Sequence, residues 1–167
     1  ENADIRGNEL YDLRSDGMNF VAVEGVVIED NYIHDFRGMP DWRDHRDMIQ
    51  FWTTGTDSPS TDIVIRGNRL DIGEGSFTQS IFMRNEAVDA GGAGKEMFYR
   101  NILIEDNSIY NSHVHGITVG ETLGLTIRNN SMIQVENEST REVPASALWV
   151  PTIRMQSRSE DVTIENN

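Results

Sequence analysis

The chain has 167 residues, enough for one domain of ordinary size with a real hydrophobic core. Its 14 basic and 28 acidic residues give a net charge of −14, which argues against nucleic acid and anionic membranes as partners. There is no cysteine, and no apolar run approaches the roughly 18 residues that a membrane span requires. We therefore expect no nucleic-acid binding, no membrane insertion and no disulfide framework.

One short motif of eight positions recurs along the chain. It begins with an apolar residue, any residue and Ile; the fourth position is Glu or Arg, and the fifth is Asp, Gly or Asn. It ends with Asn, any residue and an apolar residue. It can be read at Asp4–Leu10, Val26–Ile33, Ile63–Leu70, Ile102–Ile109 and Leu125–Met132, and a shortened copy ends the chain at Val162–Asn167. The closing asparagines are Asn8, Asn31, Asn68, Asn107, Asn130 and Asn167, which are 23 to 39 residues apart. Self-similarity at such periods indicates a solenoid.

Each copy holds a short alternating strand followed by a turn built on asparagine. Asparagine tolerates left-handed backbone angles, and its side chain can bond neighbouring backbone groups. When coils stack at about 4.8 Å per layer, the asparagines fall above one another, and their amides can bond along the column. The sequence therefore predicts an asparagine ladder at one corner of the solenoid.

A second strand follows each asparagine, and its alternation predicts which side chains point inward. The two inward columns are Met18, Ile49, Ile81, Ile117, Ile153 and Phe20, Phe51, Met83, Val119, Met155. The outward column between them is Asn19, Gln50, Phe82, Thr118 and Arg154. Strands one coil apart are expected to run parallel.

In chain order, the coils differ mainly in their insertions. The first coil, residues 1–25, and the fourth, residues 107–130, are minimal. The second carries an insertion at 34–47 and a loop at 53–61, the third an excursion at 85–100, and the fifth an excursion at 134–150. The Gly-rich run Asp89–Lys95 lacks the context of a phosphate-binding loop, so we expect a flexible loop there.

These repeats resemble the right-handed parallel β-helix superfamily, which includes pectate and alginate lyases, mannuronan C5-epimerases and bacteriophage tailspikes. The most typical coil is His115–Val119 followed by Leu125–Asn130. The predicted fold is all-β: a single-stranded, right-handed parallel β-helix of about five coils with an asparagine ladder, forming one domain over residues 1–167. Because the chain begins inside one repeat and stops inside another, we expect it to be a segment of a longer solenoid.

The long insertions flank one strand column, and solenoids place binding on the face whose loops are elaborated. The predicted groove is the outward face of the second strands. Its candidate substrate-binding residues are Gln50, Trp52, Phe82, Thr118 and Arg154. Tryptophan stacks on sugar rings and arginine pairs with carboxylates, so this set favours a polysaccharide partner.

Candidate catalytic residues lie at one corner of the groove. Proton abstraction beside a carboxylate needs a base, for which His45 or His115 is available, and a cation such as Arg84. Asp47 could orient a histidine. Both Asp47 and His115 could instead only satisfy the turn at the start of their strand. The acids available for the alternative chemistry, hydrolysis by paired carboxylates, are Asp47, Glu86 and Glu121.

The resemblance implies an extracellular or secreted enzyme, a lyase or C5-epimerase of uronate polysaccharide. The epimerase signature is Asp-Pro-His followed by Glu or Asp, and Asp44–Asp47 approaches it without the proline. A rival interpretation is a non-catalytic polysaccharide-binding spike or adhesin, which as a spike would be a homotrimer, and a third is a structural stalk. We assign no metal ligands. Calcium is the one cofactor considered, since a bound ion or the arginines must reverse the local acidity for a polyanion to bind.

Overall fold

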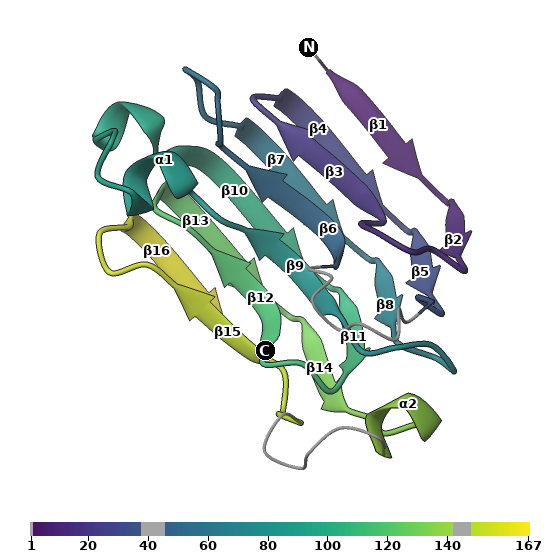
Figure 1. Ribbon diagram of the computed structural model, residues 1–167. Helices are drawn as coiled ribbons and strands as arrows, with labels where there is room; N and C mark the ends of the chain where they lie inside the picture. Colours follow the sequence, from purple (N-terminus) through teal and green to yellow (C-terminus); the bar gives the residue numbers. More distant parts are fainter. Residues whose placement is uncertain (1, 38–45, 142–147) are drawn as a thin grey trace.

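The computed structural model describes residues 2–37, 46–141 and 148–167, which wind through three parallel sheets (Figure 1). Sheet A contains β1 (Ala3–Arg6), β4 (Glu24–Glu29), β7 (Thr61–Arg66), β10 (Tyr99–Glu105), β13 (Thr122–Arg128) and β16 (Glu160–Glu165). Sheet B contains β2 (Glu9–Tyr11), β5 (Tyr32–His34), β8 (Arg69–Asp71), β11 (Ser108–Asn111) and β14 (Ser131–Gln134). Sheet C contains β3 (Met18–Val21), β6 (Asp47–Trp52), β9 (Gln79–Met83), β12 (His115–Val119) and β15 (Thr152–Met155).

The fold is a parallel β-helix, as predicted. Each strand pairs in parallel with the strand three positions along the chain, so one coil contributes one strand to each sheet, and there are about five coils. The register of sheet C is the predicted one throughout: Ile49, for example, pairs with Ile81, and Ile81 with Ile117. The predicted inward and outward columns of this sheet are therefore confirmed.

Sheet B is the part of the fold that the sequence did not predict. We expected two strands per coil, but the residue after each ladder asparagine begins a separate strand of three or four residues. Such strands are too short to show alternation in a sequence. Three short helical segments also lie outside the sheets: α1 (Glu86–Asp89), a 3-10 helix (Lys95–Met97) and α2 (Glu138–Arg141).

The corner between sheets A and B uses two adjacent residues with separate tasks. The residue before each ladder asparagine is left-handed, with φ between 54° and 63° at Gly7, Asp30, Gly67, Asp106, Asn129 and Asn166. This explains why only Gly, Asp and Asn occupy that position, since these residues adopt left-handed angles most readily. The prediction that the ladder asparagine itself supplies the left-handed turn was wrong; its side chain does the bonding.

The predicted ladder is present along the whole stack. Each asparagine Nδ2 donates to the Oδ1 of the next, at 2.8 to 3.0 Å. The same oxygen also accepts a backbone N–H, as when the Asn68 nitrogen donates to Asn107 Oδ1 at 3.0 Å. A second Nδ2 bond reaches a strand carbonyl one coil back, such as Ile65 O from Asn107 at 3.0 Å. The amides within the stack have partners on each side, which is why Asn31, Asn68 and Asn107 can be buried at 1% exposure.

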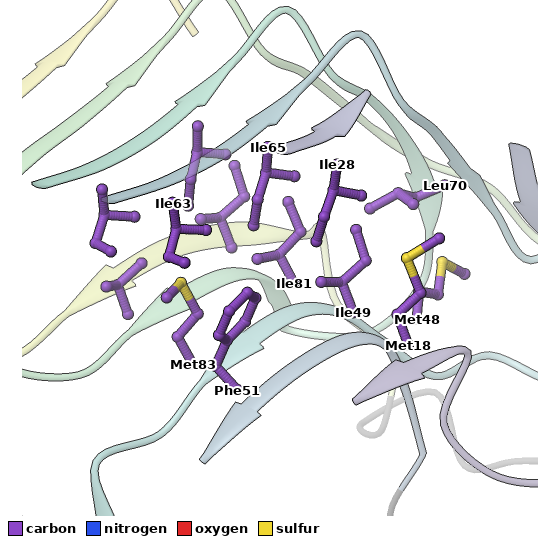
Figure 2. Packing of buried hydrophobic residues seen from close by; sticks show 14 of the residues in the cluster. Met18, Ile28, Met48, Ile49, Phe51, Ile63, Ile65, Leu70, Ile81 and Met83 are labelled. Carbon is purple, nitrogen blue, oxygen red and sulfur yellow. The ribbon is translucent and has the colours of Figure 1, made fainter. Parts of the chain in front are cut away.

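The core lies between the three sheets and consists of stacked aliphatic columns. Figure 2 shows the isoleucines of sheet A, including Ile28 and Ile65, facing Ile49 and Ile81 of sheet C. The sheet B column of Ile33, Leu70 and Ile109 closes the third side, and each of these residues is fully buried. Burying one such side chain contributes about 1.5–3 kcal/mol, so the stack is held mainly by this column packing.

Alternating charges run along the outer face of sheet A, two residues before each ladder asparagine. The column in register is Arg6, Glu29, Arg66, Glu105, Arg128 and Glu165. Glu29 bonds both Arg6 and Arg66, the latter at 2.5 Å. Glu105 pairs with Arg128 at 2.7 Å. Opposite charges on neighbouring strands stabilise a sheet. Because the signs alternate, pairing a coil with the next coil but one would place like charges opposite each other.

Candidate functional site

The outer face of sheet C presents one side chain from each coil. Asn19, Gln50, Phe82, Thr118 and Arg154 occupy successive positions in register. The face changes character along the stack, from amides in the first two coils to a ring, a hydroxyl and a guanidinium in the last three. Two excursions border it, residues 53–61 and 85–100.

A shallow pocket of about 220 Å³ lies on this face over β9, β12 and β15. We call it the sheet C pocket. It is lined by Phe82, Met83, Arg84, Asn85, Asp89, His115, Thr118, Val119, Gly120, Arg154, Met155 and Gln156. Five of the predicted site residues line it, namely Arg84, His115, Phe82, Thr118 and Arg154. The structure thus brings together two predicted catalytic residues and three predicted substrate-binding residues.

Arg84 is held at the edge of the pocket through its backbone. It follows β9 directly, and its carbonyl accepts a hydrogen bond of 2.7 Å from the Tyr99 hydroxyl. Tyr99 is fully buried, and its burial, together with the nearby carboxylates of Glu86 and Asp89, raises the pKa of its hydroxyl well above the usual value of 10.0. The neutral hydroxyl therefore remains a donor, which fixes the backbone from which Arg84 projects.

The excursion at residues 85–100 has a short helix on either side of residues 90–94, which lie in no helix or strand within the run where we expected a loop. The Thr53 hydroxyl donates to Asn85 Oδ1 at 3.1 Å and accepts from the Ala87 nitrogen at 3.0 Å. Asn85 Nδ2 donates to the Met97 carbonyl at 2.8 Å. Val88, Met97 and Phe98 then form a small buried cluster of their own. This network anchors α1, which forms one wall of the pocket.

Gly120 allows that wall to approach β12. A Cβ at this position would lie 2.9 Å from both the Cβ and the nitrogen of Asn85. Asn85 is itself fully buried and could not move away without losing its bonds. A glycine is therefore required here by close approach, and the distance between α1 and the last strands of sheet C depends on it.

His115 is oriented by contacts on several sides. Its Nδ1 lies 2.8 Å from the Thr118 hydroxyl oxygen, and its ring meets the edge of Phe82 at a centroid distance of 5.1 Å. The His113 ring stacks on it at 5.3 Å. His115 is only partly exposed, so these contacts hold the imidazole against the face while one side still borders the pocket.

The pocket is locally cationic although the chain is strongly acidic. Arg84 and Arg154 both line it, and Asp89 is its only carboxylate. Within residues 2–37, 46–141 and 148–167, Arg154 forms no ion pair. Arg84 Nε donates to Asp89 Oδ2 at 3.0 Å. Two guanidinium groups against one carboxylate leave the pocket lining with a net positive charge on an acidic chain.

Gln50 and Trp52 lie on the same face but outside the pocket, in the second coil. The Trp52 indole N–H donates to Asn19 Oδ1, and Asn19 Nδ2 donates to Gln50 Oε1 at 3.1 Å. These bonds orient the side chains without making a cavity. They place an aromatic ring and two amides on the part of the face that precedes the cationic pocket along the stack.

Asp47 does not line the sheet C pocket. Asp47 lies two residues before Ile49 on β6, so its side chain is on the same inward side of the strand, and it is fully buried. Its backbone nitrogen donates to Asp16 Oδ1 at 3.0 Å, a contact typical of a turn between coils. His45 lies outside the described residues, as does most of the insertion at 34–47 and the part of the excursion at 134–150 that covers 142–147.

Sequence reasoning missed two residues that shape the site. Asp89 was assigned to a flexible loop, and the one turn of α1 that brings it back to Arg84 leaves no periodic signal. Tyr99 was not singled out. The signal that could have identified it is an aromatic residue at the start of a strand whose other apolar residues are aliphatic. Of the acids considered for hydrolysis, Glu86 accepts the Thr53 N–H at 2.9 Å, and Glu121 pairs with Arg158 at 2.7 Å.

Comparisons of the chain with protein-family models, with curated proteins and with solved structures found no match. In the described part of the chain, no three His, Cys, Asp or Glu side chains are grouped so that they could hold a metal ion. Over the same residues, no helix is both long and apolar enough to cross a membrane. The fold and the sheet C pocket are thus the features from which a function must be argued.

Proposed function

We propose that this protein binds an acidic polysaccharide along the outer face of sheet C, with one uronate residue in the sheet C pocket. The strongest support is the position of Arg84 and Arg154 on one pocket of a chain whose net charge is −14. Guanidinium groups bind carboxylates through two parallel hydrogen bonds, so this lining suits a ligand that carries carboxylates.

The size of the pocket favours one unit of a longer ligand. Sites that enclose a whole small molecule usually measure about 300–1,000 Å³, and this one is smaller and shallow. Coils stack at about 4.8 Å, so a sugar chain that follows the stack crosses Trp52 in the second coil before it reaches Arg154 in the fifth. An extended extracellular polymer is the ligand that can contact the side chains from Trp52 to Arg154 at the same time.

Turnover by lyase or epimerase chemistry is the catalytic form of this proposal. His115 would accept the C5 proton of the bound uronate while Arg84 or Arg154 stabilises the charge that develops on its carboxylate. Departure of the neighbouring sugar from C4 as an alcohol, which takes up the proton that His115 accepted, would give an unsaturated product. Delivery of a proton from water to the opposite face of C5 would give the epimer. Hydrolysis has less support, because Glu86 and Glu121 already bond the protein's own groups.

A binding module without turnover is the second candidate. It is favoured by the full burial of Asp47, the carboxylate that was expected to orient a histidine base. The His115 Nδ1 atom instead faces the Thr118 hydroxyl, which does not stabilise an imidazolium as a carboxylate does.

Binding is tested by calorimetric titration with oligouronates and with neutral oligosaccharides of equal length. Arg154→Ala should weaken oligouronate binding about tenfold or more, because a charge-assisted contact contributes about 1.5–3 kcal/mol. Arg14→Ala is the matched control, since Arg14 is an exposed arginine far from the pocket lining and its replacement changes the net charge equally. Equal binding by both variants would refute the proposal.

Catalysis is tested separately, by following the ultraviolet absorbance of unsaturated uronate and the epimer content of the polymer by NMR. If His115 is the base, His115→Ala abolishes product formation while oligouronate binding persists. Binding by the intact protein without either product identifies the non-catalytic module instead.

A further inference from the structure

We propose that Asp89 is a built-in competitor of the acidic ligand, whose carboxylate occupies the position on Arg84 that the ligand's carboxylate must take. The inference rests on the proposed function, because it concerns the same pocket. It assigns to Asp89 a role in specificity that the sequence does not suggest.

The Arg84–Asp89 pair has the geometry expected of a contact between Arg84 and the carboxylate of a ligand. Arg84 Nε donates to Asp89 Oδ2 at 3.0 Å, and both residues line the sheet C pocket. A carboxylate binds a guanidinium through two parallel bonds either side-on, at Nε and one terminal nitrogen, or end-on, at the two terminal nitrogens. The proposed ligand contact is the side-on one, in which Asp89 already holds Nε and must release it.

Asp89 can release Arg84 without loss of the fold around it. In the described part of the chain its carboxylate has Arg84 as its one hydrogen-bond partner. The wall that carries it is anchored elsewhere, through Thr53, Asn85 and the buried Val88 cluster. The side chains of Arg84 and Asp89 are 55% and 25% exposed, and an ion pair this accessible to water contributes little to stability.

The consequence is a lower affinity for acidic ligands than the two arginines alone would give. An oligouronate must replace the carboxylate of Asp89 on Arg84 with its own, and its approach is assisted by Arg154 on β15, which has no internal partner among the described residues. A neutral sugar does not compete for Arg84, so Asp89 changes its affinity little. Asp89 thus moderates binding of a polyanion in particular.

The experiment compares Asp89→Asn, Asp57→Asn and Arg154→Ala with the unmodified protein by calorimetric titration. Asp57 is an exposed acid in the neighbouring excursion, outside the pocket lining, so its variant has the same change in charge. We expect Asp89→Asn to bind an oligouronate about fivefold more tightly, the amount that an exposed ion pair opposes binding. Asp57→Asn should stay within about twofold, as expected for a distant charge screened by salt.

Two results overturn the inference while leaving the proposed function intact. One is unchanged oligouronate affinity in Asp89→Asn when Arg154→Ala weakens binding. The other is weaker binding together with a lower melting temperature in Asp89→Asn, which would make Asp89 a support for Arg84. If Arg154→Ala and Asp89→Asn both leave binding unchanged, the proposed function itself fails.

Discussion

At the scale of single residues, the corner between sheets A and B shows how two neighbouring positions divide one task. Asp106 has a φ of 55° and turns the chain, while Asn107 is 1% exposed and bonds the coils on either side. The sequence motif identified the column correctly because the asparagine never varies. It could not separate the two tasks, since asparagine is suited to both and also occurs at the left-handed position, as in Asn129.

Replacement of Asn107 should destabilise the fold, whereas replacement of Asp106 by glycine should not. Asn107→Ala removes the acceptor of the Asn68 side-chain and backbone N–H groups and the side-chain donor to Asn130 Oδ1 and the Ile65 carbonyl, so we expect the free energy of unfolding to fall by about 3 kcal/mol or more. Asp106→Gly should be neutral within about 0.5 kcal/mol, because glycine adopts the left-handed conformation readily. Urea denaturation of both variants measures the contrast, and similar losses in the two would contradict the division of tasks.

The ionisation of Tyr99 should make the free energy of unfolding depend on pH in the alkaline range. Its pKa is raised in the folded chain, so the folded state keeps its proton above the unfolded value of 10.0, where the unfolded state loses it. Stability should therefore be constant up to about pH 10 and fall as the pH rises further. Tyr99→Phe should lower the unfolding free energy at neutral pH by about 1–2 kcal/mol through the unpaired Arg84 carbonyl, and make the alkaline fall shallower.

Denaturant titrations at about pH 8 and about pH 11 measure this difference. Tyr110→Phe serves as the control, because that ring is only partly buried and lies on the outer face of sheet B. An alkaline fall of the same steepness in Tyr99→Phe would show that other groups carry the pH dependence.

At the scale of elements, alternation over four or more residues decided what could be predicted. The strands of sheet C are four to six residues long, and their inward and outward side chains were assigned correctly. The strands of sheet B are three or four residues long and start directly after the ladder asparagine, so the sequence indicated them only as part of the turn. The single turn of α1 was likewise indicated only as loop. The pocket wall was missed for the same reason, although the face that bears the pocket was predicted.

The charge column of sheet A gives a prediction at this scale. Glu29→Arg would place three positive side chains in consecutive coils, so the free energy of unfolding should fall by about 1 kcal/mol or more. Higher salt should recover part of the loss by screening. Glu29→Gln separates the lost attraction from the added repulsion. If both variants are as stable as the unmodified protein at low salt, the column has no effect on the stacking of coils.

At the scale of the whole molecule, the fold concentrates a cationic site on an acidic protein. Stacking in register brings Arg84 from the third coil and Arg154 from the fifth to one pocket, although they are far apart in sequence. The pattern of insertions pointed to this face, and in the described part of the chain the excursion at residues 85–100 supplies one wall of the sheet C pocket. Residues of the second coil, Gln50 and Trp52, extend the face beyond the cavity.

The most direct test of acidic-polysaccharide binding is NMR chemical-shift mapping with an oligouronate. We predict that the shifted amides cluster on the outer face of sheet C, around Arg84, His115, Thr118 and Arg154, and that a neutral oligosaccharide of equal length shifts them far less. Shifts centred on the outer face of sheet A or B, or no shifts with any oligouronate, would contradict the account.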